Sequence, residues 1–122
     1  MKILYIEDNY VNRLIIEKSM AKYATVVAEE NGFKGIELGK SDDFDFILID
    51  LNLADPEIDG FGVLKALKKE GVKAVTAAVT AFAGSDWKKK CLDAGFDLYF
   101  PKPVRAEELW VELNEFRDAR NA

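Results

Sequence analysis

The sequence predicts an α/β fold in which five parallel strands form one sheet and five helices cover its two faces. Short runs of large apolar residues, such as residues 46–49, indicate strands that are buried on both faces. These runs alternate with longer segments in which apolar residues recur at helical spacing. No linker, repeat or low-complexity segment interrupts the alternation, so we expect residues 1–122 to form a single domain.

The first half of the chain predicts three strands, over residues 2–6, 24–28 and 45–50. Asn9 is suited to cap a helix that continues to about residue 22, with Val11, Leu14, Ile15 and Ile16 as the candidate residues at helical spacing. A second helix should begin near residue 32. Its three glycines make it the weakest helical prediction, because glycine disfavours a helix interior.

The second half predicts two strands, over residues 74–80 and 97–100. A helix is expected from Gly60 to Gly71, and Ser85 is expected to cap the next, which ends at Gly95. The last helix should present an apolar face that consists of Leu109, Leu113 and Phe116.

Polar and charged residues stand at or just after the ends of the predicted strands, and those of the first, third, fourth and fifth strands form a candidate group. In a doubly wound sheet the carboxyl ends of the strands form the ligand site, so we expect these side chains to converge. They are Glu7, Asp8, Asp50, Thr80 and Lys102. Crowded carboxylates disfavour one another's ionised form unless a cation joins them. A hard divalent ion such as Mg²⁺, which binds carboxylate and carbonyl oxygens, is the natural partner for this set.

Taken together, these motifs resemble the receiver domain of two-component response regulators, the CheY-like superfamily. The resemblance covers essentially the whole chain, and its joint spacing is specific although each motif alone is weak. It is carried by Glu7-Asp8, Asp50, Thr80-Ala81, Tyr99 and Lys102-Pro103. It implies a flavodoxin-like fold with strand order 2-1-3-4-5.

The resemblance also implies a phosphoacceptor function. Asp50 would accept a phosphoryl group from a phosphohistidine of a histidine kinase or histidine phosphotransfer protein. Mg²⁺ would be bound by Asp8, Asp50 and the backbone carbonyl of Asn52, with Glu7 contributing through a water molecule. Such a protein is a signalling phosphoacceptor and not an enzyme, because it catalyses only its own phosphorylation and dephosphorylation.

The same family implies a switch. Lys102, in a cis peptide bond with Pro103, would pair with a phosphoryl oxygen. The Thr80 hydroxyl would turn toward the phosphoryl group and Tyr99 would rotate inward. The surface formed by the last two helices and the strand between them would then change and bind a downstream protein partner.

Composition excludes several other classes of function. The net charge of −5 argues against a nucleic-acid partner, which requires a basic face. One Cys and no His leave no intrachain disulfide, no common zinc site and no His-activated nucleophile. No apolar run is long enough for a membrane helix, so we expect a cytoplasmic protein without membrane contact.

Two alternatives stay open at this level. A receiver-like protein-interaction module that is not phosphorylated would share the same fold. The chain could also be a stand-alone receiver or one part of a longer hybrid kinase. The chain departs from the family pattern in the loop after Asp50, where Ala54 replaces a common proline and Asp59-Gly60 arrives two residues late. The shape of this loop cannot be predicted from the sequence.

Overall fold

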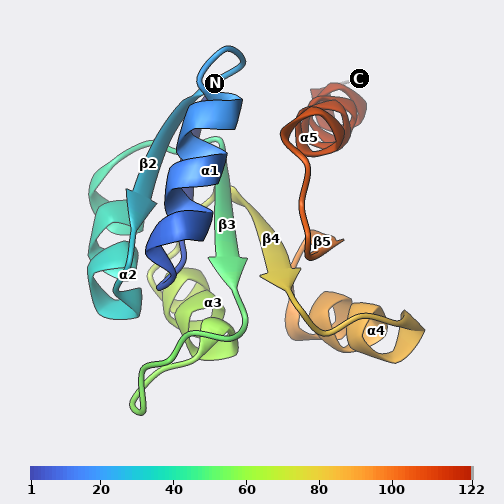
Figure 1. Ribbon diagram of the computed structural model, residues 1–122. Coiled ribbons are helices and arrows are strands. Elements are labelled where there is room, and N and C mark those ends of the chain that lie inside the picture. Colours follow the sequence, from blue (N-terminus) through green and yellow to red (C-terminus); the bar gives the residue numbers. More distant parts are fainter. Residues whose placement is uncertain (122) are drawn as a thin grey trace.

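The computed structural model describes residues 1–121 and contains a parallel five-stranded sheet in the order β2-β1-β3-β4-β5 (Figure 1). This arrangement confirms the predicted fold class and strand order. The strands are β1 (Lys2–Ile6), β2 (Thr25–Glu29), β3 (Phe46–Asp50), β4 (Val75–Thr80) and β5 (Leu98–Pro101). β1 pairs with β2 and β3 in parallel register, and this places the ends of β1 and β3 side by side.

The five helices are α1 (Tyr10–Met20), α2 (Gly32–Ser41), α3 (Gly60–Lys69), α4 (Ser85–Ala94) and α5 (Ala106–Asn121). Each follows one strand, as the alternation predicts. In the part of the chain that the structure describes, no helix is both long and apolar enough to cross a membrane.

Two hydrophobic cores lie on opposite faces of the sheet. Side chains of α1 and α5 pack on one face against Ile3, Tyr5 and Leu48. Side chains of α2, α3 and α4 pack on the other face against Leu4 and Ile6. Alternate residues of β1 therefore serve different cores, and this explains why the central strands are apolar without alternation.

Several predicted boundaries differ from the structure by one or two residues, as is usual for element ends. Of the apolar residues that predict α1, only some face the sheet. Val11 and Ile15 are more than half exposed, whereas Ile16 and Met20 are buried. Helical spacing fits both sets of residues, and only the packing of α1 against the sheet decides which set faces inward.

The predicted cap of α4 is also wrong. Ser85 is the first residue of the helix, and the capping position is occupied by Gly84, which makes no side-chain hydrogen bond. Gly84 has a φ angle of 119°, a conformation that favours glycine. Gly95 closes the other end in the left-handed conformation, as predicted.

The glycines of α2 allow it to approach the sheet closely. A Cβ atom at Gly35 would lie 2.5 Å from the Ile6 side chain, and one at Gly39 would lie 2.8 Å from Leu67. The same glycines that lower the helical propensity of α2 therefore allow it to pack closely against β1 and α3. The tertiary contacts of α2 outweigh its weak propensity.

Gly60 begins α3 directly beneath the end of β3, so a Gly60→Ala variant tests how tightly this region is built. The added Cβ would lie 2.6 Å from the backbone oxygen of Asp50 and 2.7 Å from the Cα of Leu51. Backbone atoms cannot turn aside, so we expect a loss of about 1–3 kcal/mol in the free energy of unfolding, measured by urea denaturation.

Gly62→Ala is the matched control for this substitution. Its Cβ would lie 2.9 Å from Cγ1 of Ile58, a partly buried side chain that can adjust more readily than backbone atoms. Alanine also favours a helix interior over glycine by roughly 0.5–1 kcal/mol. We therefore expect little change or a small gain. A Gly60→Ala protein as stable as the Gly62→Ala protein would contradict the close approach.

Candidate functional site

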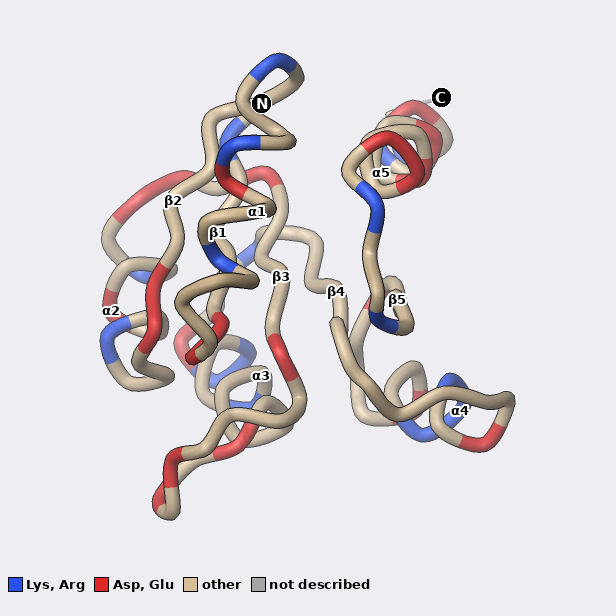
Figure 2. Tube along the Cα trace, in the orientation of Figure 1, with Lys and Arg blue, Asp and Glu red and all other residues tan. Residues whose placement is uncertain are grey.

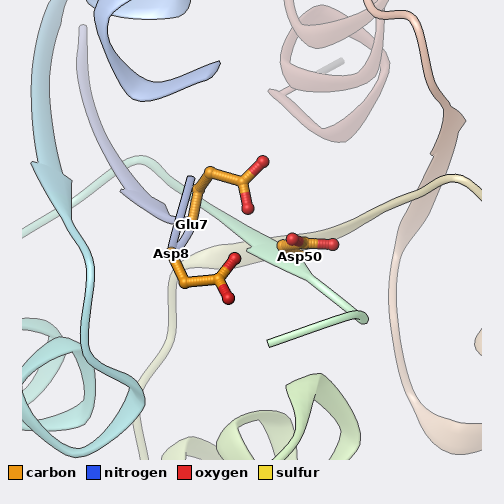
Figure 3. Close-up of side chains that lie close together, drawn as sticks. All are labelled: Glu7, Asp8 and Asp50. Carbon is orange, nitrogen blue, oxygen red and sulfur yellow. The ribbon is translucent and has the colours of Figure 1, made fainter. Parts of the chain in front are cut away.

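Three carboxylates meet at the carboxyl edge of the sheet, as predicted. Glu7 and Asp8 directly follow β1, and Asp50 is the last residue of β3. Figure 3 shows the three side chains extending toward a common volume. One oxygen atom from each lies within 4.8 Å of the others. The side chains differ in burial, because Glu7 is fully buried, Asp50 is 2% exposed and Asp8 is partly exposed.

Lys102 adds an ammonium group to this cluster from the loop after β5. Its Nζ lies 2.8 Å from Oε1 of Glu7 and 3.3 Å from Oδ2 of Asp50. The Lys102 backbone N–H donates to the Thr80 carbonyl oxygen at 2.7 Å, and this fixes the loop beside the end of β4. The Lys102-Pro103 peptide bond is cis, as the resemblance implies.

The surroundings of the two buried carboxyl groups shift their pKa values in opposite directions. Burial raises the pKa of Asp50, and the neighbouring Glu7 raises it further. Burial alone would also raise the pKa of Glu7, but its interactions with Asp50, Lys102 and Asn12 together lower it below its usual range. Burial lowers the pKa of Lys102, and its hydrogen bond to Glu7 and the charge of Asp50 outweigh this and raise it. In the metal-free protein Asp50 therefore takes up a proton more readily than Glu7 does.

Thr80 is fully buried beside the cluster, at the end of β4. Its hydroxyl donates to Oδ1 of Asn52 at 3.1 Å and accepts from the Phe82 backbone N–H at 2.9 Å. The Tyr99 hydroxyl in turn donates to the Phe82 carbonyl oxygen at 2.6 Å. The two residues predicted to form a switch, Thr80 and Tyr99, are thus connected through the backbone of Phe82.

The loop between β3 and α3 is anchored at both ends. Leu51 and Leu53 are buried in the core shared with α2 and α3. The Ala54 backbone N–H donates to Oδ2 of Asp8 at 2.8 Å, and Asp59 caps α3 through the Gly62 N–H. Between these anchors the loop extends away from the sheet (Figure 1). The first residues of the loop therefore remain beside the cluster, while the residues between the two anchors lie apart from it.

The donor set fits a hard divalent cation. Three carboxylates provide the oxygen ligands that Mg²⁺ prefers. Oε2 of Glu7 is buried and has no hydrogen-bond partner among the described residues. An unpaired buried carboxylate oxygen is costly, so such an atom indicates a position where a ligand or its bound water belongs.

Three residues around Glu7 were missed by the sequence analysis. The Asn12 side-chain amide donates to Oε1 of Glu7 at 2.8 Å, and the Tyr5 hydroxyl makes a longer contact with the same atom at 3.3 Å. Arg13 donates to the Glu7 carbonyl oxygen at 2.8 Å. Their closeness in sequence to Glu7 could have indicated these contacts. All three lie within six residues of Glu7, on β1 and in the first turns of α1.

Comparison with known protein families agrees with this geometry. The model of the family described as response regulator receiver domain matches residues 3–114. The chain belongs to this family. It is therefore a receiver domain, a signalling module of two-component systems, and receiver domains in general receive their phosphoryl group from a histidine kinase or phosphotransfer protein.

Curated response regulators contain a segment similar to this receiver domain. It is 36% identical over 119 residues to the cell cycle response regulator CtrA of Brucella ovis. The matched region covers 93% of this chain and 49% of the relative. The same values hold for CtrA of Brucella anthropi. The chain thus spans about half the length of the curated relatives it matches.

Two solved receiver domains have the same fold. The receiver domain of Francisella response regulator 1452 superimposes with a TM-score of 0.88 at 23% identity, over 98% of both chains. The receiver domain of the sensor histidine kinase PA1611 from Pseudomonas aeruginosa gives a TM-score of 0.81 at 29% identity, over 93% of this chain and 94% of that one. The latter structure contains a magnesium ion coordinated in its active-site cleft.

Proposed function

We propose that Asp50 is the phosphoacceptor and takes a phosphoryl group from a phosphohistidine of a histidine kinase or histidine phosphotransfer protein. The observation that carries this proposal is the position of Asp50. It ends a buried central strand, with the Lys102 ammonium 3.3 Å from its Oδ2 and two further carboxylates beside it. Phosphoryl transfer needs a fixed nucleophile and charge neutralisation, and this site provides both.

The transfer needs no general base from the protein. A carboxylate oxygen of Asp50 attacks phosphorus, and an O–P bond forms while the P–N bond of the phosphohistidine breaks. The electron pair of that bond stays on the imidazole nitrogen of the donor, which takes up a proton from solvent. With a divalent cation bound beside it, Asp50 would attack as an anion and would need no base to remove a proton, so the absence of histidine in this chain is no obstacle.

Asp8, Asp50 and the backbone carbonyl of Asn52 would hold Mg²⁺, with Glu7 contributing through a water molecule. When bound, the ion supplies positive charge that allows the carboxylates to be ionised together and offsets charge on the phosphoryl oxygens. Lys102 would pair with another phosphoryl oxygen. The magnesium ion seen in the PA1611 receiver domain supports this assignment.

Phosphorylation would act on the surface of α4, β5 and α5 through Thr80. A phosphoryl oxygen competes for the Thr80 hydroxyl, which now bonds Asn52 and the Phe82 N–H. A shift of Phe82 would free the Tyr99 hydroxyl, so that Tyr99 could turn inward. The altered surface, which includes the lysines at residues 88–90 on α4 (Figure 2), would bind a downstream protein partner.

We further propose that residues 1–122 form one receiver domain acting in the cytoplasm through protein contacts, without nucleic acid or membrane as a direct partner. Its only chemistry would be its own phosphorylation and dephosphorylation. The acidic composition and the mixed charges along the chain (Figure 2) support a protein partner over nucleic acid.

Incubation with acetyl phosphate and Mg²⁺, followed by intact-mass measurement, tests the proposed function. We expect one phosphoryl adduct on the wild-type protein, none on Asp50→Asn, and loss of the adduct when EDTA replaces Mg²⁺. Asp97→Asn is the control, because Asp97 accepts from Thr76 at the opposite edge of the sheet. An adduct on Asp50→Asn would assign the wrong residue. A wild-type protein without an adduct would favour the non-phosphorylated interaction module.

A further inference from the structure

The two carboxylate oxygens of Glu7 have different surroundings. Oε1 accepts from the Asn12 amide at 2.8 Å, from Lys102 at 2.8 Å and from the Tyr5 hydroxyl at 3.3 Å. Oε2 is equally buried and has no hydrogen-bond partner among the described residues. Three donors on one oxygen fix the rotation of the carboxylate, and when Asp50 is ionised no group among the described residues donates to Oε2, which leaves it available for a ligand.

Asn12 is held rigidly for this contact. Its backbone N–H donates at 2.9 Å to the side chain of Asn9, which caps α1, so the first turn of the helix fixes its position. The next residue, Arg13, binds the Glu7 carbonyl oxygen at 2.8 Å. Consecutive residues of α1 therefore hold both the backbone and the side chain of Glu7.

Lys102 cannot hold Glu7 in every state of the protein. In the proposed function it pairs with the phosphoryl group, and its contact with Oε1 must then weaken. The Tyr5 contact is longer than an ordinary hydroxyl hydrogen bond. Asn12 is the one strong donor to Oε1 that has no other role in the site.

We propose that Asn12 is a positioning residue that holds Glu7 with Oε2 turned toward a divalent cation bound at the site. This inference rests on the proposed function in one respect, namely that Mg²⁺ binds to the cluster. Groups that orient metal-binding carboxylates contribute substantially to metal affinity, although they do not touch the ion.

Titration of the metal-free protein with MgCl₂ tests this role. Binding is followed by NMR through the backbone amides of Asn52 and Ala54, which donate to Asp50 and Asp8 respectively. We expect Asn12→Ala to weaken Mg²⁺ binding about 10-fold. Asn12→Leu should do the same. The capping bond uses the backbone of Asn12, so both variants should fold. Asn114→Ala, which removes an amide on α5 that contacts Arg117, is the matched control and should bind as wild type.

A double-mutant cycle with Glu7→Gln separates positioning from general structural damage. If Asn12 acts through Glu7, Asn12→Ala should not weaken Mg²⁺ binding further in the Glu7→Gln background. An Asn12→Ala protein with wild-type affinity, or the same 10-fold loss in both backgrounds, would overturn this inference alone. A wild-type protein that does not bind Mg²⁺ would overturn the metal site of the proposed function, and this inference with it.

Discussion

Asp50→Asn is expected to raise the free energy of unfolding of the metal-free protein by on the order of 1–3 kcal/mol at pH 8. The carboxyl group of Asp50 is buried beside Glu7, and its pKa is raised above the ordinary value, first by burial and then by Glu7. The ionised form of Asp50 is therefore less favourable in the folded protein than in the unfolded chain. Asparagine has the same shape and can still accept from the Asn52 N–H, but it carries no charge.

The pH dependence identifies the cause of this gain. A raised pKa means that the folded protein binds a proton more tightly than the unfolded chain does. The wild-type protein should therefore lose stability as the pH rises from about 4, the ordinary pKa of Asp, through the raised pKa of Asp50. Asp50→Asn should lack this loss.

Urea denaturation in EDTA across this pH range measures both effects. Addition of Mg²⁺ should stabilise the wild-type protein and have much less effect on the variant. Asp97→Asn removes a carboxylate that accepts from Thr76 and should bring no gain. An Asp50→Asn protein no more stable than wild type at pH 8 would show that the cluster is not under electrostatic strain.

Lys102→Met is expected to have the opposite effect, a loss of about 2–4 kcal/mol at pH 8 without metal. The substitution keeps much of the apolar length of the side chain and removes the ammonium group that lies against Glu7 and Asp50. The fully buried carboxylate of Glu7 then loses its only cation within ion-pair distance among the described residues.

Two comparisons identify the origin of this loss, again by urea denaturation. It should shrink as the pH falls toward 5, because Asp50 then takes up a proton and the cluster carries less charge. It should also be smaller in the Asp50→Asn background. Lys89→Met breaks an exposed pair with Asp93 and should change stability by less than about 0.5 kcal/mol. An equal loss from both lysine substitutions would refute the special role of Lys102.

The sequence contains the information for the acidic cluster because strand ends are local features. Glu7 and Asp50 each terminate an apolar run, and a parallel sheet brings such ends to one edge. The strand order, by contrast, came from the resemblance. It depends on which strands pair, and pairing leaves no local signal in a single sequence.

Contacts between elements are the part that the sequence could not predict. Asn12 reaches Glu7 because α1 begins at a particular angle to β1, which no residue pattern encodes. The same limit explains why the inner face of α1 could not be chosen from the sequence, because Val11 and Ile15 fit helical spacing as well as Ile16 does. Ser85 failed as a cap because glycine at the preceding position allows an unusual backbone angle there.

The attachment of α4 has a consequence for how a signal could leave this molecule. In α4, all of whose residues are described, Cys91 is the one buried side chain, and glycines with positive φ stand at both ends of the helix. Displacing the helix would remove Cys91 from the core that it shares with Leu64 and Phe96, whereas most of that core comes from the sheet, α2 and α3. Local opening of α4 therefore costs far less free energy than global unfolding. The proposed phosphorylation of Asp50 would therefore have to supply only this smaller free energy to displace α4.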